Sequence, residues 1–385
     1  MKILIINLMH LGDLMLMTPI LPIIRREYGE AEINLLVDRK LKDLVSENPN
    51  IDKILTLDKK GVDNKPLNFL RFLQQIRKMK FDLVINCHRN ERASSIAAFS
   101  GAKRIVGYSK PFFSLFFEST INNEAVAHHI GSGPFGLFGK KRYKPGWVHQ
   151  VASYTNILIK CLKVKVTTSE GLFMKPHKKA VDNIKKLYKE QFPNDRKIVA
   201  LNVGASWETK RWIFEYFASV ADALVKEGYM IAFLGGEMDR GFVRETVSYM
   251  KTDKAEQERS VRIFTGKLTL GEVAAFLQKT SLFITTDSGP MHIGVAANVP
   301  IVTMFGASPV PGFYPYTDKA ILIAAKTKCH PCGEHICPKM ENNFACMKNI
   351  TPTEVLQAAH ELLDKYGAKP AEELPPTVNF TPEVR

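Results

Sequence analysis

The chain of 385 residues is 45% hydrophobic and 24% charged, and its formal net charge is +14. This length and composition are typical of a soluble globular protein with two domains and exclude a disordered chain. No run reaches the roughly 20 uncharged apolar residues of a membrane-spanning helix. The positive charge predicts an anionic partner, such as a phosphorylated substrate or an acidic membrane surface. Because no long basic arm or nucleic-acid-binding motif is present, we expect no nucleic-acid partner.

The N-terminal segment, MKILIINLMHLGDLML, combines a lysine with an apolar run, as a secretion signal does. His10 and Asp13 interrupt this run, and no small-residue cleavage site follows. We therefore interpret residues 2–7 as the first buried strand and expect the protein to be cytoplasmic.

The first half of the chain alternates strand-like and helix-like segments. A helix to about Tyr28, with Pro19 within its first turns, follows the first strand. Further strands are expected at 32–37, 53–57, 81–87 and 103–107, with helices near 39–47, 67–79 and 91–99. Residues 108–147, rich in Gly, Pro, Phe and basic residues, break the rhythm and are either functional or a partly ordered loop with a small hydrophobic cluster.

A second alternation begins at 197–203, after a helix near 148–162 and a lysine-rich stretch around 175–190. Its further strands are expected at 229–234, 261–264, 281–286 and 300–305, with helices at 213–227, near 239–251, at 269–279 and from about 290. Thr269 and Glu272 have the spacing of a capping box, which predicts a helix start.

Two consecutive doubly wound halves predict an α/β fold of two Rossmann-like domains facing a central cleft. We place the N-terminal domain at 1–175 and the C-terminal domain at 195–350. A C-terminal helix is expected at 353–366 and a disordered Pro- and Glu-rich tail at 369–385. Ligands bind at the carboxyl ends of the strands in such sheets, so the loops that follow the strands are the places to look for functional residues.

Asp13 follows the first strand in the loop NLMHLGD. The loop has no G-x-G-x-x-G, which makes a nicotinamide dehydrogenase unlikely. A carboxylate here is either a helix N-cap or a general base that takes a proton from a hydroxyl group.

Three loops of the second half carry further candidates. Thr285-Thr-Asp-Ser-Gly-Pro-Met-His292 passes from a strand into a helix, whose free N–H groups suit a diphosphate. Lys210 follows the strand at 197–203, where it either neutralises a diphosphate or is a solvated surface lysine. Glu237 follows Gly235-Gly236, where it either binds a nucleoside or caps the next helix.

Together these blocks resemble glycosyltransferase family 9, the ADP-heptose:lipopolysaccharide heptosyltransferases. The resemblance rests on the N-terminal K-I-L-I-I-N-x4-G-D-x4-T-P block, the Lys-Arg-Trp loop, Gly-Gly-Glu and Asp-Ser-Gly-Pro-Met-His followed by P-I-V-T-M-F-G. It implies a GT-B fold, a terminal helix that crosses back to the first domain, and an inverting displacement that requires no metal or other cofactor.

The resemblance also implies roles for individual residues. Asp13 would be the general base, Lys210 would neutralise the departing diphosphate, Glu237 would contact the nucleoside, and Asp287 the heptose or ribose. The phosphates would be held by Ser288, Gly289 and His292 and, less securely, by Ser206. The candidate contacts to the acceptor are Lys59, Lys60, Arg89 and Arg92, each of which has an ordinary surface role as its alternative.

The expected reaction transfers heptose from ADP-heptose to Kdo-lipid A or a partial lipopolysaccharide core, at the anionic inner face of the inner membrane. The alternatives are a transferase of the same fold with another nucleotide sugar or a protein acceptor, and a non-catalytic relic that binds nucleotide or lipid. The joint presence of Asp13, Lys210 and Asp287 argues against the relic.

Four of the six cysteines cluster as Cys329-x2-Cys332-x4-Cys337-x8-Cys346. This spacing predicts either a structural zinc or iron site or reduced thiols. Cys87 and Cys161 stand alone in apolar contexts and are expected in the core. Nothing in the sequence links the cluster to the active site, so we assign it to structure.

Overall fold

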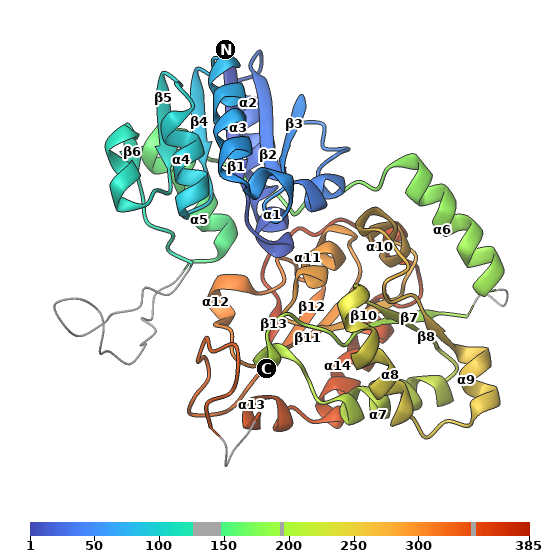
Figure 1. Ribbon diagram of the computed structural model, residues 1–385. Helices are drawn as coiled ribbons and strands as arrows, with labels where there is room; N and C mark the ends of the chain where they lie inside the picture. Colours follow the sequence, from blue (N-terminus) through green and yellow to red (C-terminus); the bar gives the residue numbers. More distant parts are fainter. Residues whose placement is uncertain (126–147, 193–195, 340–343) are drawn as a thin grey trace. The chain divides into compact units, whose positions relative to one another are not determined.

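The computed structural model describes residues 1–125, 148–192, 196–339 and 344–385, and it divides into two compact units, Met1–Lys175 and Pro176–Arg385 (Figure 1). Each unit is built on its own sheet, and every strand pair in both sheets is parallel, as the alternation predicts. Of the expected irregular segment at 108–147, residues 126–147 lie outside the described part.

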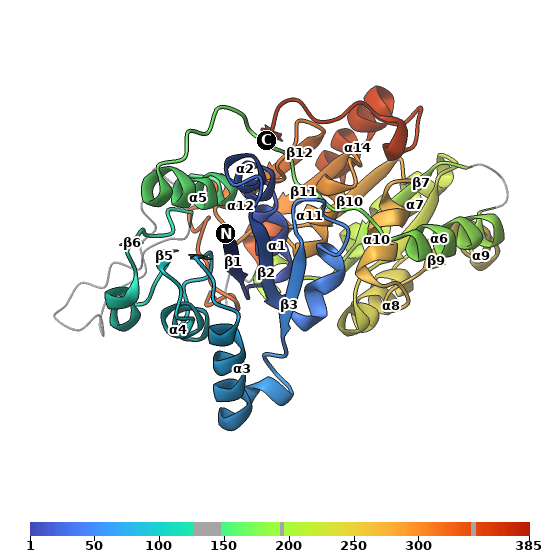
Figure 2. The ribbon, with the colours of Figure 1, turned by 90° about the horizontal axis from the view of Figure 1, so that it is seen from above.

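The first unit has the strand order β3-β2-β1-β4-β5-β6, which is the order of a Rossmann fold. The strands are β1 (Lys2–Asn7), β2 (Glu32–Asp38), β3 (Lys53–Leu57), β4 (Leu83–Asn86), β5 (Arg104–Gly107) and β6 (Ser119–Thr120). The helices are α1 (Leu11–Met17), α2 (Ile20–Glu27), α3 (Pro66–Lys78), α4 (Glu91–Phe99) and α5 (Gln150–Asn156), with the short turns η1 (Arg39–Leu44), η2 (Val62–Asn64), η3 (Pro111–Phe116) and η4 (Ile157–Cys161). The central strands β1, β2 and β4 are buried on both faces, which explains their continuous apolar runs. The outer strands β3 and β6 are partly exposed. Figure 2 shows helices on both sides of the sheet.

The single helix expected up to Tyr28 is wrong, because the chain forms two helices that are separated at Thr18 and Pro19. Proline has no N–H and cannot continue the hydrogen-bonding ladder. The Thr18 hydroxyl donates to the carbonyl of Met15 at 2.7 Å and accepts the N–H of Phe173 at 3.0 Å. Thr18, at the break between the two helices, therefore anchors Phe173 near the end of the first unit.

The second unit has the order β13-β12-β11-β10-β7-β8-β9, which repeats the Rossmann order with one added edge strand. Its strands are β7 (Ile198–Asn202), β8 (Met230–Leu234), β9 (Val261–Ile263), β10 (Leu282–Thr286), β11 (Ile301–Phe305), β12 (Ala320–Ala324) and β13 (Glu383–Val384). Its helices are α6 (Lys178–Gln191), α7 (Phe214–Lys226), α8 (Arg240–Ser248), α9 (Lys254–Ser260), α10 (Leu270–Leu277), α11 (Gly289–Ala296), α12 (Val310–Phe313), α13 (Ala345–Lys348) and α14 (Pro352–Tyr366), with η5 (Glu208–Lys210), η6 (Glu237–Asp239) and η7 (Ala371–Glu373). The expected capping box of Thr269 and Glu272 is present at the start of α10.

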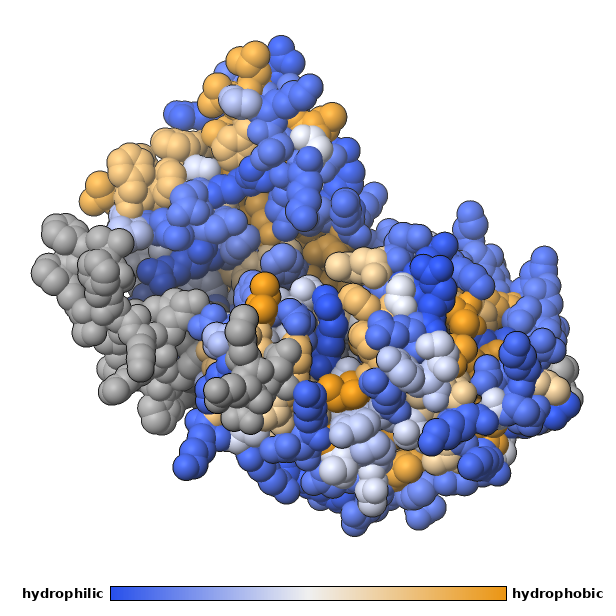
Figure 3. Space-filling view, turned by 60° about the horizontal axis from the view of Figure 1, so that its bottom comes forward, coloured by the Kyte–Doolittle hydropathy of each residue, from blue (hydrophilic) through white to orange (hydrophobic). Residues whose placement is uncertain are grey.

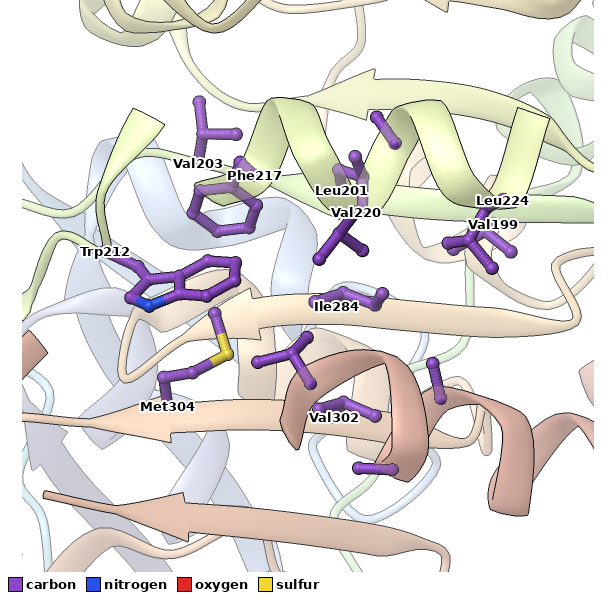
Figure 4. Packing of buried hydrophobic residues seen from close by; sticks show 14 of the residues in the cluster. Val199, Leu201, Val203, Trp212, Phe217, Val220, Leu224, Ile284, Val302 and Met304 are labelled. Carbon is purple, nitrogen blue, oxygen red and sulfur yellow. The ribbon is translucent and has the colours of Figure 1, made fainter. Parts of the chain in front are cut away.

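The core of the second unit lies between the sheet and helices α7 and α14. Trp212 packs edge-to-face against Phe217 of α7, beside Ile284 and Met304 of the central strands (Figure 4). The indole N–H of Trp212 donates to the carbonyl of Ile350 at 2.9 Å. This bond fastens the segment before α14 to the loop that follows β7.

The buried residues of α14 belong to the core of the second unit, where the helix contacts α7, β10, β11 and β12. The expected crossing of this helix to the first unit stays a prediction. The expected disorder of the tail is wrong. The tail is ordered, because Ala371 is fully buried, the amide of Asn298 donates to three tail carbonyls, and the last residues add strand β13 to the sheet. Among the described residues, no helix is long and apolar enough to span a membrane.

Candidate active site

Each sheet has a point where the strand order reverses, between β1 and β4 in the first unit and between β7 and β10 in the second. The loops that leave the carboxyl ends of such a strand pair diverge and leave room for a ligand. Asp13, Lys210 and Asp287 follow β1, β7 and β10 respectively. The sequence therefore places its principal candidates at the two switch points.

Asp13 is the third residue of α1, whose N-cap is His10, so the interpretation of Asp13 as an N-cap is wrong. The buried Asn7 shapes this loop: its amide donates to the carbonyl of Asp13 at 3.4 Å, and its oxygen accepts the N–H of Met9 at 3.1 Å. Asp13 is partly exposed. Burial raises the pKa of the neighbouring Tyr154 well above its usual range, and the charge of Asp13 raises it further.

Three of the four expected acceptor contacts form hydrogen bonds inside the first unit. The ammonium of Lys59 donates to the carbonyl of Leu8 at 2.6 Å and pairs with Asp38 at 3.0 Å. Arg92 donates to the carbonyl of Lys59 at 2.9 Å. These two side chains hold the loops beside Asp13 in place. Arg89 is exposed but donates its Nε–H to the carbonyl of Ser109 at 3.3 Å. Lys60 is exposed.

His88, which the sequence did not single out, lies beyond β4 at the same switch point. Its Nδ1 is buried and has no hydrogen-bond partner among the described residues. Burial, together with the nearby positive charge of Lys59, lowers the pKa of His88 to about 3, so the ring is neutral at pH 7. A neutral imidazole at this edge can accept or donate one hydrogen bond.

In the second unit Lys210 and Asp287 form an ion pair, with 2.8 Å between Nζ and Oδ2. The two side chains are 19% and 6% exposed, so the interpretation of Lys210 as a solvated surface lysine is wrong. The ammonium also lies 4.3 Å from the ring centroid of Trp207. The Lys210 ammonium is therefore the partner of the buried Asp287 Oδ2.

Unsatisfied buried polar atoms gather around this pair. They are Asn202 Oδ1, Thr286 Oγ1 and His292 Nδ1. Such atoms are rare in folded proteins, and each calls for a partner that is absent from the protein itself. Burial lowers the pKa of His292 to about 4, so this ring is also neutral at pH 7. The polar groups at this position can accept hydrogen bonds from hydroxyl groups and can donate hydrogen bonds to an oxyanion.

Helix α11 begins at the same place. Its N-cap, Ser288, makes no capping bond with its side chain. Instead the Ser288 hydroxyl lies 3.2 Å from the amide of Asn202, which ties the loop after β10 to the end of β7. The first N–H group of the helix, that of Gly289, lacks a side-chain cap, so this end of the helix suits a phosphate.

Glu237 and Ser206 are exposed residues of neighbouring loops. Glu237 pairs with Arg240 at 2.9 Å and lines a hollow of about 560 Å³ at the carboxyl ends of β8 and β9. Asp239, which the sequence missed, is buried against Gly204: a Cβ at Gly204 would lie 2.0 Å from its Oδ1. A second hollow, of about 620 Å³, lies between α6 and β9 and contains none of the expected site residues.

The cysteine segment lies against the loop that carries Lys210. Cys329, Cys332 and Cys337 are partly exposed and Cys346 is buried, and all four are free thiols. Burial and, to a smaller extent, the other three thiols together raise the pKa of Cys346 to about 11. Within the described ranges, no three His, Cys, Asp or Glu side chains are arranged to hold a metal ion. The Cys87 and Cys161 side chains are buried, as expected.

Comparison with known proteins identifies the family. Residues 69–342 match the model of glycosyltransferase family 9 (heptosyltransferase). Lipooligosaccharide heptosyltransferase 2 of Campylobacter jejuni is 29% identical over 252 residues, which cover 65% of this chain and 74% of that protein.

Two solved structures share the fold. A family 9 glycosyltransferase from Veillonella parvula is 30% identical and superposes with a TM-score of 0.81, covering 94% of this chain and 97% of that one. Escherichia coli ADP-heptose lps heptosyltransferase II is 18% identical, with a TM-score of 0.71 and coverage of 95% and 99%. The two Rossmann-like units are those of the GT-B fold, and the chain is a glycosyltransferase that belongs to family 9, the heptosyltransferases.

Proposed function

We propose that the chain transfers a heptose from ADP-heptose to the inner core of lipopolysaccharide, with inversion at the anomeric carbon. The observation that carries the proposal is the set of unsatisfied buried polar atoms around Lys210 and Asp287 at the start of α11. They offer a cation, helix N–H groups and hydroxyl acceptors, which are the groups that a nucleoside diphosphate sugar requires. Two relatives support this donor and this acceptor, because one is a lipooligosaccharide heptosyltransferase and the other an ADP-heptose lps heptosyltransferase.

In the proposed reaction the acceptor hydroxyl oxygen attacks the anomeric carbon while the bond from that carbon to the phosphate oxygen breaks. The carboxylate of Asp13 receives the hydroxyl proton, and ADP leaves with the electron pair of the broken bond. Lys210 and the α11 N-terminus stabilise the charge that develops on the diphosphate. Asp287 and Thr286 accept hydrogen bonds from donor hydroxyls, and the neutral His292 donates to a phosphate oxygen or accepts from a hydroxyl.

The distribution of charge supports acceptor binding by the first unit. Residues 1–175 contain 27 Lys and Arg against 15 Asp and Glu, whereas residues 176–385 contain 26 against 24. The first unit therefore carries a net charge of +12 out of the total of +14. An acceptor bearing carboxylates and phosphates is attracted to such a unit, and so is an anionic bilayer.

We propose further that the enzyme acts as a peripheral protein at the cytoplasmic face of the inner membrane. The segment 64–81 contains five basic residues and no acidic one, and it exposes Leu67 and Leu70 of α3. Phe112 and Leu115 of η3 are 72% and 87% exposed. Figure 3 shows hydrophobic side chains among hydrophilic ones at its upper left, in the first unit. Basic residues combined with exposed apolar side chains are typical of interfacial segments.

The test of the reaction compares the wild type with Asp13→Ala, using ADP-heptose and a heptose-deficient lipid A that bears Kdo. We expect product from the wild type, a rate lower by about a hundredfold or more in the variant, and unchanged ADP affinity in both. Full activity of the variant would refute the role of Asp13. Tight ADP binding without transfer to any truncated core would indicate a protein acceptor or another donor sugar.

The membrane proposal is tested by sedimentation with vesicles that contain anionic lipid. Replacing both Phe112 and Leu115 with Ser should weaken binding roughly tenfold, because two exposed apolar side chains lose their burial in the interface. The control is Val378→Ser, which alters a side chain of the second unit that is 83% exposed. Equal binding by all three proteins would contradict the assignment of this surface.

A further inference from the structure

The loop between β7 and α7 carries Lys210, and it is held by a segment far along the chain. Thr209 donates its N–H to the carbonyl of His335 at 3.4 Å and its hydroxyl to the carbonyl of Glu334. The imidazole of His335 stacks on the indole of Trp207, with 4.0 Å between ring centroids and 25° between planes. The segment with the cysteine cluster therefore contacts both residues that flank Glu208 in this loop.

The same indole contacts the ammonium of Lys210. Nζ lies 4.3 Å from the Trp207 ring centroid and 2.8 Å from Asp287 Oδ2. Lysine has a long flexible side chain, and its ammonium is a point charge without directional preference. When a diphosphate competes with Asp287 for this charge, the aromatic ring remains as the fixed contact that limits where the ammonium moves.

The segment 329–337 is itself fixed to the sheet. His330 Nδ1 lies 2.5 Å from the carbonyl of Gly306, and Gly333 donates its N–H to the carbonyl of Ala307 at 2.9 Å. Gly306 directly follows β11 and has no room for a side chain: a Cβ there would lie 2.8 Å from the carbonyl oxygen of Thr209 and 2.8 Å from the sulfur of Met347. The segment therefore connects the end of β11 to the loop that carries Lys210.

We infer that His335 is a positioning residue, which acts through Trp207 to hold the Lys210 ammonium where it stabilises the departing diphosphate. This inference rests on the proposed function of Lys210. His335 itself is exposed and contributes nothing to the core, so its replacement leaves the fold intact. The cysteine cluster, which the sequence assigned to structure alone, is part of the element that positions a catalytic group.

The experiment compares four single variants and one double variant of the full chain in turnover and in ADP binding. His335→Ala removes the stacked ring and should lower kcat about tenfold, with a smaller change in KM. His335→Phe restores an aromatic ring and should recover most of the rate. Phe380→Ala is the matched control, because it also breaks a stacked pair of the second unit, that with Tyr316 at 4.6 Å, and should leave kcat unchanged.

Lys210→Ala separates the inference from the function on which it rests. We expect His335→Ala to weaken ADP binding in the wild-type background and to have no further effect in the Lys210→Ala background, because both changes act on one ammonium. Wild-type kcat in His335→Ala beside an impaired Lys210→Ala would overturn the positioning role and leave the proposed function standing. Full activity of Lys210→Ala would instead refute the role of the lysine. An equal effect of His335→Ala in both backgrounds, or no recovery with Phe, would show that His335 does not act through Lys210.

Discussion

Protonation of His292 should destabilise the second unit at mildly acidic pH. The ring is 3% exposed, and burial lowers its pKa from 6.5 to about 4. A histidine with a depressed pKa in the folded state binds fewer protons than in the unfolded chain between these values, so stability is retained above pH 6.5 and lost as the pH falls towards 4. Between pH 7.5 and pH 5, this single group should lower the free energy of unfolding by about 2 kcal/mol.

The assay is urea unfolding at both pH values, followed by the fluorescence of Trp207 and Trp212 in a Trp147→Phe background. His292→Gln removes the titrating ring, and its loss of stability between the two pH values should be smaller than that of the wild type by about 2 kcal/mol. His360→Gln alters a partly exposed histidine of the same unit and serves as the control. An equal loss in the wild type and in His292→Gln would refute the reasoning, because it would mean that burial does not hold His292 in its neutral form.

Three further outcomes are expected. Lys210→Met should lower the free energy of unfolding in urea by about 2–3 kcal/mol, because it leaves a buried carboxylate without its cation. Lys326→Met alters an exposed pair at 4.0 Å and should lower it by less than about 0.5 kcal/mol. Equal losses in the two variants would contradict the burial argument. Gly107→Ala should lower the free energy of unfolding by about 3 kcal/mol or more, because the φ of Gly107 is +116° and a Cβ would lie 2.3 Å from a carbonyl oxygen. Gly228 has a φ of +94° and open space around it, so Gly228→Ala should lower it by about 1–2 kcal/mol. Similar losses in the two variants would show that the protein relieves the clash at Gly107. The cysteine spacing leaves a zinc or iron site and reduced thiols as alternatives, and elemental analysis of the purified chain separates them. Metal that is present in the wild type and lost in Cys332→Ser would support the metal site, whereas no metal in the wild type would support reduced thiols.

The sequence predicts the sheets well because parallel strands are buried on both faces and appear as continuous apolar runs. The sequence locates the principal site residues for a related reason: Asp287 directly follows such a run, and Asp13 and Lys210 lie in the segments that come after one. The sequence does not predict two shorter strands. Strand β12 (Ala320–Ala324) resembles many other apolar stretches. Strand β13 (Glu383–Val384) has only two residues, and its pairing depends on the edge that β12 offers. The composition of the tail predicts disorder, yet the side chain of Asn298 donates hydrogen bonds to three of its carbonyls, a long-range contact that no local pattern encodes.

The roles of polar residues were harder to predict than their positions. Lys59 and Lys60 are adjacent and chemically identical, yet one is bound to two main-chain carbonyls and Asp38 whereas the other is exposed. Asp239 and His88 were missed because burial gives them their significance, and burial depends on the packing of residues distant in sequence. The same applies to His335, whose contact with Trp207 joins positions 128 residues apart.

The electrostatics of the two units suit the two substrates that we propose. The donor site contains one buried cation, already balanced by Asp287, and a histidine that stays neutral at pH 7. Such a site holds a diphosphate by exchange of the lysine's partner and by oriented dipoles rather than by excess charge. Part of the free energy of ADP binding is then spent on breaking the existing ion pair between Lys210 and Asp287. This cost keeps the affinity for ADP moderate and favours the release of ADP after transfer. The first unit, with its surplus of twelve positive charges, lacks this internal compensation and can attract an anionic acceptor from a distance. Raising the ionic strength should therefore weaken acceptor binding more than donor binding, because exposed charges are screened and buried pairs are not.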